Sequence, residues 1–173
     1  LPGEGFTILN SRAGLKVGVL NLMGNIFMKK CDDVFITAKN FLKNNKLKDE
    51  YDFLIVDFHA EITSEKMAMG HLFDGCATLV VGTHTHVPTN DARILKNGTA
   101  YLTDAGMCGD YNSVIGMNIK NSLNKFFKND AVKHFPAEGE ASLCGIIVES
   151  DHTNGLANKT QSFIYGGDLK NFN

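Results

Sequence analysis

The chain has 173 residues, of which 43% are hydrophobic and 21% are charged, and this composition suits one globular domain or the larger piece of one. Its net charge of −2 provides no basic surface for a nucleic-acid backbone, so charge does not support RNA as a partner. Arg12 and Arg93 are the only arginines, so a bound phosphate would need another source of positive charge, and metal ions are the obvious candidates. No apolar run approaches the roughly 18 residues of a membrane helix, so no membrane partner is expected.

The first part of the chain predicts a hairpin followed by a helix. Phe6–Leu9 and Lys16–Leu22 are apolar, β-branched runs with glycines beside them, which is typical of two paired strands. After these runs, apolar residues recur at helical spacing up to Leu42, and Asp32 or Asp33 is placed to cap the start of the helix. A polar stretch follows and ends it.

The middle of the chain predicts a strand–helix–strand unit. Phe53–Val56 and Thr78–Val81 are short continuous apolar runs, which suit strands covered on both faces. Between them, Thr63 is placed to cap a helix, and we expect its inner side to carry Met67, Ala68, His71 and Leu72. Such a unit predicts two parallel strands joined by a helical crossover.

The last part predicts a second hairpin, a helix and two closing strands. Ile94–Tyr101 contains the Asn97-Gly98 pair, which is the strongest short hairpin signal. Asn118 is placed to cap a helix, and Leu143–Val148 and Gln161–Tyr165 are typical of strands. That helix carries Ile119, Leu123, Phe126 and Phe127. No repeat or linker interrupts the chain, so residues 1–173 are expected to belong to one domain.

The cysteines indicate a reducing compartment. Cys31, Cys76, Cys108 and Cys144 are widely spaced and include no CxxC pair. We therefore expect four free thiols and a cytoplasmic protein.

Three histidines follow the predicted strands of the middle unit. His59 comes just past the first strand, His84 just past the second, and His86 two residues later. Because ligands bind beyond the carboxyl ends of neighbouring parallel strands, we expect the three imidazoles to converge there on a metal such as zinc, iron, manganese or copper. The alternative, that these histidines are hydrogen-bonded loop residues, stays open at this point.

Other polar residues have two interpretations each. Asp57 and Glu61 flank His59, and they either support a ligand imidazole or point away as strand-end residues. Asp104 either supports a ligand or forms a turn before Gly106. Three further histidines are isolated and are expected to be structural or exposed: His71, His134 and His152.

Two blocks of sequence carry a family resemblance. The run Val81-Gly82-Thr83-His84-Thr85-His86 resembles the glycine-histidine-x-histidine signature of calcineurin-like metallophosphoesterases. Together with Asp57-Phe58-His59-Ala60-Glu61 and Thr63–Lys66, it resembles the YmdB-like bacterial phosphodiesterases within that group. Further matches are Gly98–Tyr101, Thr103-Asp104, Gly106-Met107 and Ala137–Gly139, so the resemblance covers essentially the whole chain.

The resemblance implies an α/β fold, namely the calcineurin-like metallophosphoesterase sandwich of two β-sheets flanked by helices in the order α-β-β-α. It implies two metal ions, iron or manganese with zinc as a further candidate, with His59 and His84 on one metal and His86 on the other. The family begins with a βαβ segment that has no counterpart here. Residues 1–173 are therefore expected to be the C-terminal part of a single metallophosphoesterase domain, with the N-terminal segment as its partner.

The function implied by the resemblance is hydrolysis of 2′,3′-cyclic nucleotides or related phosphodiesters by a hydroxide held between two metals. No catalytic residue is identified in this chain, because the family's bridging ligand and leaving-group acid lie in the absent segment. The alternative is a non-catalytic metal-binding, scaffold or regulatory protein that retains the fold. Assembly into a homo-oligomer also stays open.

Overall fold

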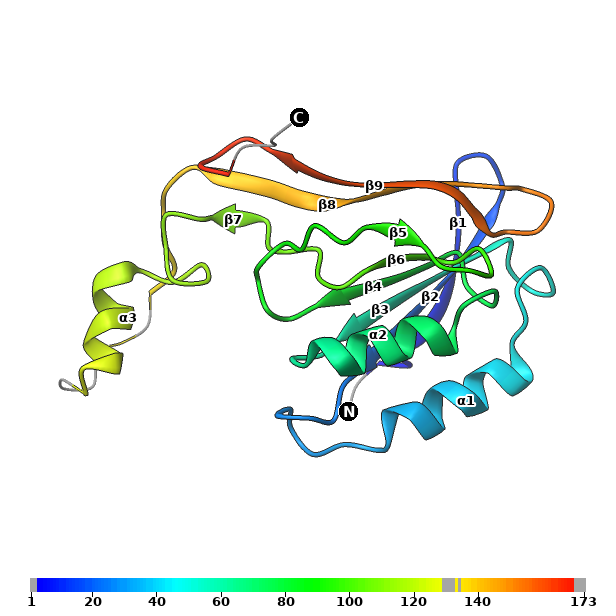
Figure 1. Cartoon of the computed structure of the whole chain (residues 1–173), viewed down its shortest axis with the longest axis horizontal. Helices are drawn as coiled ribbons and strands as arrows, with labels where there is room; N and C mark the ends of the chain where they lie inside the picture. The colour runs from blue at the N-terminus through cyan, green and yellow to red at the C-terminus, as the bar shows by residue number, and fades with distance from the viewer. Residues whose placement is uncertain (1–2, 129–132, 134, 170–173) are drawn as a thin grey trace.

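A six-stranded sheet in the order β1-β2-β3-β4-β6-β5 forms the centre of the computed structural model, which describes residues 3–128, 133 and 135–169 (Figure 1). The parallel strands β2, β3, β4 and β6 lie side by side, and β1 and β5 pair antiparallel at the two edges. The strands are β1 Phe6–Asn10, β2 Lys16–Met23, β3 Phe53–His59, β4 Leu79–Thr83, β5 Arg93–Ile94 and β6 Ala100–Leu102.

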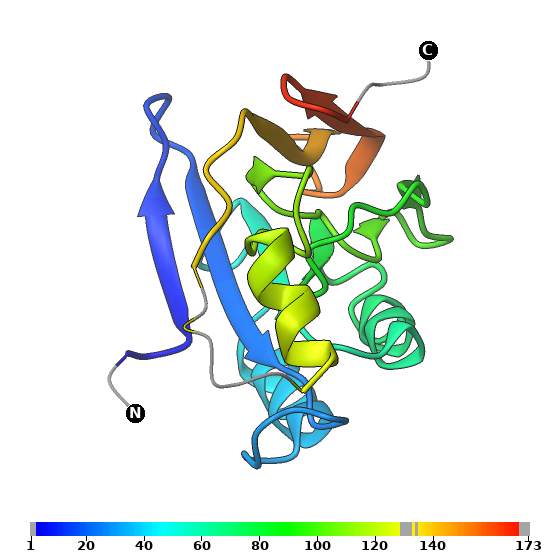
Figure 2. The ribbon, with the colours of Figure 1, turned by 90° about the vertical axis from the view of Figure 1, so that its left-hand side faces the viewer.

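A smaller sheet and two helices cover the two faces of the large sheet (Figure 1). The small sheet has the order β7-β8-β9, with β7 Gly109–Asp110, β8 Ala141–Ser150 and β9 Ala157–Tyr165. On the opposite face lie α1 Val34–Asn44 and α2 Thr63–Leu72. A third helix, α3 Ile119–Phe126, lies beyond the end toward which the parallel strands run, as Figures 1 and 2 show.

The expected α-β-β-α order is therefore only partly seen. The described residues give one helix layer and two sheet layers, since α3 sits at an end of the sheets rather than on the outer face of β7–β9 (Figure 1). The fold is a mixed α/β arrangement with two sheets in the described part of the chain.

The main core lies between the large sheet and the helices α1 and α2. Successive side chains of a strand point to opposite faces, and in β3 the residues Leu54, Val56 and Phe58 have no exposed surface and join the cluster that includes Ala38 of α1 and Met69 of α2. The other face forms a smaller cluster, in which Leu79, Ala100 and Ala157 are buried against partly buried neighbours from β3, β4 and β8. The helix-covered face is thus the better buried of the two.

Most of the predicted elements are confirmed. β1 and β2 form the expected hairpin, and the Asp33 carboxylate caps α1 by accepting the Ile36 N–H at 3.0 Å. The unit β3-α2-β4 has parallel strands, and β5 and β6 form the hairpin around Asn97-Gly98. The Asn118 side chain caps α3 by accepting the Asn121 N–H at 3.2 Å.

The prediction for α2 was wrong in two respects. Ile62 is the N-cap residue and no side chain caps the helix, so Thr63 is its first residue rather than its cap. The inner side carries Glu65, Lys66, Met69 and Gly70, whereas Met67, Ala68 and His71 are exposed. The helix is turned this way because Lys66 pairs inside with Asp104, and because the Tyr101 ring packs so close to Gly70 that a Cβ there would lie 2.5 Å from Tyr101 Cδ2.

Three smaller expectations can be compared with the structure. All four cysteines are free, as predicted. His152 is exposed, as is His71, while His134 lies outside the described residues. In the described part of the chain, no helix has both the length and the apolar character needed to cross a membrane.

Candidate metal centre

Two of the three predicted histidines meet at the carboxyl ends of β3 and β4. His59 is the last residue of β3 and pairs in register with Thr83, the last residue of β4, so His84 follows directly beside it. His84 Nδ1 lies 3.1 Å from His59 Nε2, and the two rings meet edge to face with centroids 4.7 Å apart. The predicted convergence of His59 and His84 at one edge of the sheet is confirmed.

His86 has a different partner. It is exposed, and its Nδ1 donates a hydrogen bond of 2.8 Å to the carbonyl oxygen of Ile115, in the segment that leads to α3. Within residues 3–128, 133 and 135–169, no group of three or more His, Cys, Asp or Glu side chains is close enough to hold a metal ion. The structure therefore brings together His59 and His84, and His86 does not join them.

The loop that carries His84 and His86 has an uncommon backbone. His84 has φ +105° and His86 has φ +66°, in a region that residues other than glycine rarely adopt. Between them, the Thr85 N–H donates to Asp104 Oδ2 at 3.1 Å. Strained backbone persists where surrounding structure over-determines it, and this hydrogen bond is one such restraint.

Asp104 itself is held by a buried ion pair. Lys66 Nζ lies 2.6 Å from Asp104 Oδ2, and each of the two side chains is 1% exposed. The other carboxylate oxygen accepts the Gly106 N–H at 2.9 Å. Asp104 thus forms the turn before Gly106, which is one of its two predicted roles, and it contacts the histidine loop through the Thr85 backbone rather than through a histidine ring. Nothing in the sequence indicated that Lys66 would be its partner.

A row of polar side chains runs across three strands to His59. The Asp57 carboxylate accepts hydrogen bonds of 2.8 Å from Asn21 Nδ2 and from the Thr83 hydroxyl, and Thr83 Oγ1 lies 3.2 Å from His59 Nδ1. Asp57 and His59 are two residues apart on β3, so they share a face of the sheet and Asp57 does not point away. Nothing in the sequence pointed to Asn21, because its relation to His59 depends on the register between strands.

Glu61 approaches the second histidine from the solvent side. Its Oε2 lies 3.0 Å from His84 Nε2, with the Glu61 side chain 47% exposed and the His84 side chain 33% exposed. Both carboxylates that flank His59 in sequence therefore contact the histidine pair, Asp57 through Thr83 and Glu61 directly.

The electrostatic surroundings favour a neutral His59. Burial lowers the pKa of His59, and the neighbouring His84 lowers it further, while Asp57 opposes the shift. A histidine must be unprotonated at the ligating nitrogen to bind a metal. A lowered pKa therefore keeps this imidazole available near neutral pH.

The spacing of the two facing nitrogens fits a shared metal ion. Metal–nitrogen bonds are about 2.1 Å long, so two nitrogens 3.1 Å apart are close enough for both His59 and His84 to bind one ion. The pair supplies two ligands and leaves the other positions to further groups.

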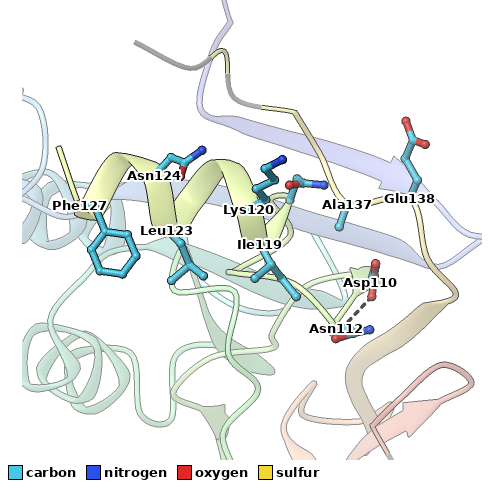
Figure 3. Close-up of a pocket in the computed structure, with 10 residues that line it drawn as sticks. Asp110, Asn112, Ile119, Lys120, Leu123, Asn124, Phe127, Ala137 and Glu138 are labelled. Carbon is cyan, nitrogen blue, oxygen red and sulfur yellow. Dashed lines mark hydrogen bonds between the residues drawn. The ribbon is translucent and has the colours of Figure 1, made fainter. Parts of the chain in front are cut away.

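One cavity adjoins the histidine loop, and another lies along α3. One of about 470 Å³ starts at Val87 and Thr89, directly after His86, and extends to Tyr111 and Phe163. Another of about 550 Å³ runs along α3, where Figure 3 shows Ile119, Leu123 and Phe127 with Asp110 and Asn112 at the far end. The three histidines line neither cavity. The first has the size of a small-molecule site and adjoins the loop.

Comparison with known proteins identifies the family of this chain. The model of the YmdB-like proteins matches residues 1–163, and the chain belongs to that family. It is 40% identical over 167 residues to the 2′,3′-cyclic-nucleotide 2′-phosphodiesterase of Bacillus subtilis, covering 96% of this chain and 62% of the relative.

Two solved structures are similar along nearly the whole chain. A hypothetical protein from Thermus thermophilus matches with a TM-score of 0.87 and 36% identity, covering 97% of this chain and 64% of its own. A novel phosphatase from Mycoplasma pneumoniae matches with a TM-score of 0.84 and 36% identity, covering 96% and 58%. The chain thus spans about three fifths of the length of these relatives.

Proposed function

We propose that this chain is part of a metal-dependent phosphodiesterase of the calcineurin-like metallophosphoesterase type, acting on 2′,3′-cyclic nucleotides or related phosphodiesters. The observation that carries the proposal is the contact between His59 and His84 at the ends of adjacent parallel strands, in a chain that belongs to the YmdB-like family. Two relatives, named a 2′,3′-cyclic-nucleotide 2′-phosphodiesterase and a phosphatase, support the same chemistry.

The three histidines of this chain would divide between two metal ions. His59 and His84 present facing nitrogens to one ion, and His86, which points to the segment before α3, would bind a second ion together with residues outside this chain. When bound, two such ions would supply a hydroxide nucleophile and neutralise the charge on the phosphate. Iron and manganese suit this ligand chemistry, with zinc as a third candidate.

The positive charges of this chain support a role for metals. Arg93 is engaged by Asp91 at 2.8 Å and lies over the Tyr101 ring, and Lys66 is buried against Asp104. Arg12 lies in the β1–β2 turn, at the end of the sheet opposite His59, because β2 starts after it and runs parallel to β3. Neither arginine is thus placed to clamp a phosphate at the histidines.

The test is turnover by the full-length protein. Metal is stripped, manganese is added back, and hydrolysis of 2′,3′-cyclic AMP and of bis-p-nitrophenyl phosphate is measured for wild type, His84→Ala and His71→Ala. We expect His84→Ala to lose more than about 100-fold in kcat/KM, since even groups that only support a metal ligand are worth 10–100-fold.

His71→Ala is the matched control, because this histidine is exposed on α2, away from the strand ends. It should retain wild-type activity. Equal activity of His84→Ala and wild type would remove the proposed mechanism, and metal binding without any turnover would favour a metal-binding scaffold or regulatory protein instead.

A further inference from the structure

The hydrogen bonds around the histidine pair determine which ring nitrogens carry protons. Asp57 is the starting point, since an ionised carboxylate can only accept hydrogen bonds. The Thr83 hydroxyl is 2.8 Å from Asp57 Oδ1, so its single proton is directed to that oxygen. Asn21 Nδ2 donates to the other oxygen at 2.8 Å and holds the carboxylate in place.

The Thr83 hydroxyl then presents only a lone pair to His59. Thr83 Oγ1 is 3.2 Å from His59 Nδ1, and with its own proton directed to Asp57 it must accept there. His59 therefore carries its proton on Nδ1. In the neutral ring this leaves a lone pair on Nε2, which is the nitrogen that faces His84.

Glu61 likewise fixes which nitrogen of the His84 ring carries the proton. Glu61 Oε2 is 3.0 Å from His84 Nε2 and accepts, so His84 carries its proton on Nε2. In the neutral ring the lone pair is then on Nδ1. The nitrogens left without protons, His59 Nε2 and His84 Nδ1, face one another at 3.1 Å. Two lone pairs facing each other repel unless a positive centre, a proton or a metal ion, lies between them.

We propose that Asp57, acting through Thr83, and Glu61 are positioning residues that fix the tautomers of His59 and His84 so that both lone pairs point to one metal position. This inference rests on the proposed function for the identity of the site, and it adds the residues that prepare the two ligands. Partners of metal-bound histidines orient the ring and increase its basicity.

The two supports differ in strength. Thr83 and Asp57 are half-buried strand residues, and the pairing of Thr83 opposite His59 is set by the register of β3 and β4. Glu61 follows the strand and its side chain is 47% exposed, so water competes for the same hydrogen bond. The Asp57–Thr83 support is the stronger of the two.

The experiment measures metal binding by the full-length protein, separately from activity. Zn²⁺ is added to metal-free wild type, Thr83→Val, Thr83→Ser and Glu61→Gln, and the dissociation constant is measured by competition with a chelating dye. Thr83→Val keeps the side-chain shape but removes the hydroxyl, and it should weaken binding by about 10–100-fold. Thr83→Ser restores the hydroxyl and should return the affinity to within about 3-fold of wild type, as should Glu61→Gln, whose amide oxygen still accepts from His84.

Thr160→Val is the matched control. Like Thr83, Thr160 is a half-buried threonine in a strand, but it lies on β9 in the other sheet. Its hydroxyl donates a hydrogen bond of 3.3 Å to the carbonyl oxygen of Ile147. Its Zn²⁺ affinity should equal that of wild type. If Thr83→Val binds Zn²⁺ as tightly as Thr160→Val, the positioning role is wrong.

A second measurement does not depend on any variant. ¹⁵N-edited NMR of the Zn²⁺-loaded wild type should find protons on His59 Nδ1 and His84 Nε2. A proton on His59 Nε2 would overturn the inference even if Thr83→Val failed to fold. Failure of the proposed function is distinguishable, because it would appear as absent turnover in wild type while the NMR and affinity results stayed as expected.

Discussion

The helix-covered sheet, residues 6–105, and the C-terminal part, residues 107–169, differ in how many of their apolar side chains are buried. Phe58 of the first is fully buried, and even the charged Lys66 of α2 lies inside. Of the described residues after 106, only Cys144 and Ala157 are buried hydrophobics. The C-terminal part exposes large apolar side chains, among them Ile119, Leu123, Phe126, Phe127, Leu143 and Ile147.

The helices α2 and α3 differ in which of their side chains they bury. The apolar residues of α3 recur at helical spacing, yet they remain exposed, while α2 turns a lysine and a glutamate inward and Met67 outward. Apolar periodicity therefore indicates that a helix forms, but the partner of its apolar side need not be present in the described residues. Stability and the histidine geometry should both depend on the helix-covered sheet.

The largest expected contrast is between two phenylalanines. Phe58→Ala removes a ring with no exposed surface from the main core and should lower the free energy of unfolding by about 3–5 kcal/mol. Phe126→Ala, on the exposed side of α3 at 75% exposure, should change it by less than about 0.5 kcal/mol. Urea unfolding of both variants measures the difference, and comparable losses would show that α3 is packed in solution.

One buried and one exposed ion pair should differ in the same way. Lys66→Met leaves the Asp104 carboxylate buried without its partner and should cost about 3–5 kcal/mol of unfolding free energy. Lys159→Met breaks the exposed pair with Glu149 in the β8–β9 hairpin and should have no measurable effect. Thermal unfolding followed by circular dichroism tests both. A stable Lys66→Met protein would mean that Asp104 finds another donor.

The smallest of the three contrasts concerns two strand glycines. At Gly82 of β4 a Cβ would lie 1.8 Å from the Thr103 carbonyl oxygen, so Gly82→Ala forces backbone apart and should cost about 1–3 kcal/mol or more. At Gly109 of β7 the nearest atom would be at 3.7 Å, an ordinary contact, so Gly109→Ala should be tolerated. Chemical denaturation of the two variants measures their free energies of unfolding. A Gly82→Ala variant as stable as wild type would mean that β4 and the segment after β6 separate easily.

The amino-acid sequence was enough to predict the order and type of most elements, though not the short strand β7, and the meeting of His59 and His84. Both follow from local patterns: apolar runs mark β3 and β4, the helix between them makes these strands parallel, and residues just past parallel neighbours reach the same edge. The helix caps at Asp33 and Asn118 could also be predicted from the sequence, because capping depends on a few adjacent residues.

Four features depend on contacts between distant segments and could not be predicted from the sequence. They are the direction of His86, the buried pairing of Lys66 with Asp104, the support of His59 by Thr83, and the exposure of α3. Thr83 stands opposite His59 because of strand register, and the rotation of α2 brings both Lys66 to Asp104 and Gly70 to the Tyr101 ring. Register and helix rotation are set by packing between segments far apart in the chain. Local periodicity carries no information about them, and for that reason only the fold could show that Asp57 supports His59 through Thr83 and that Glu61 contacts His84.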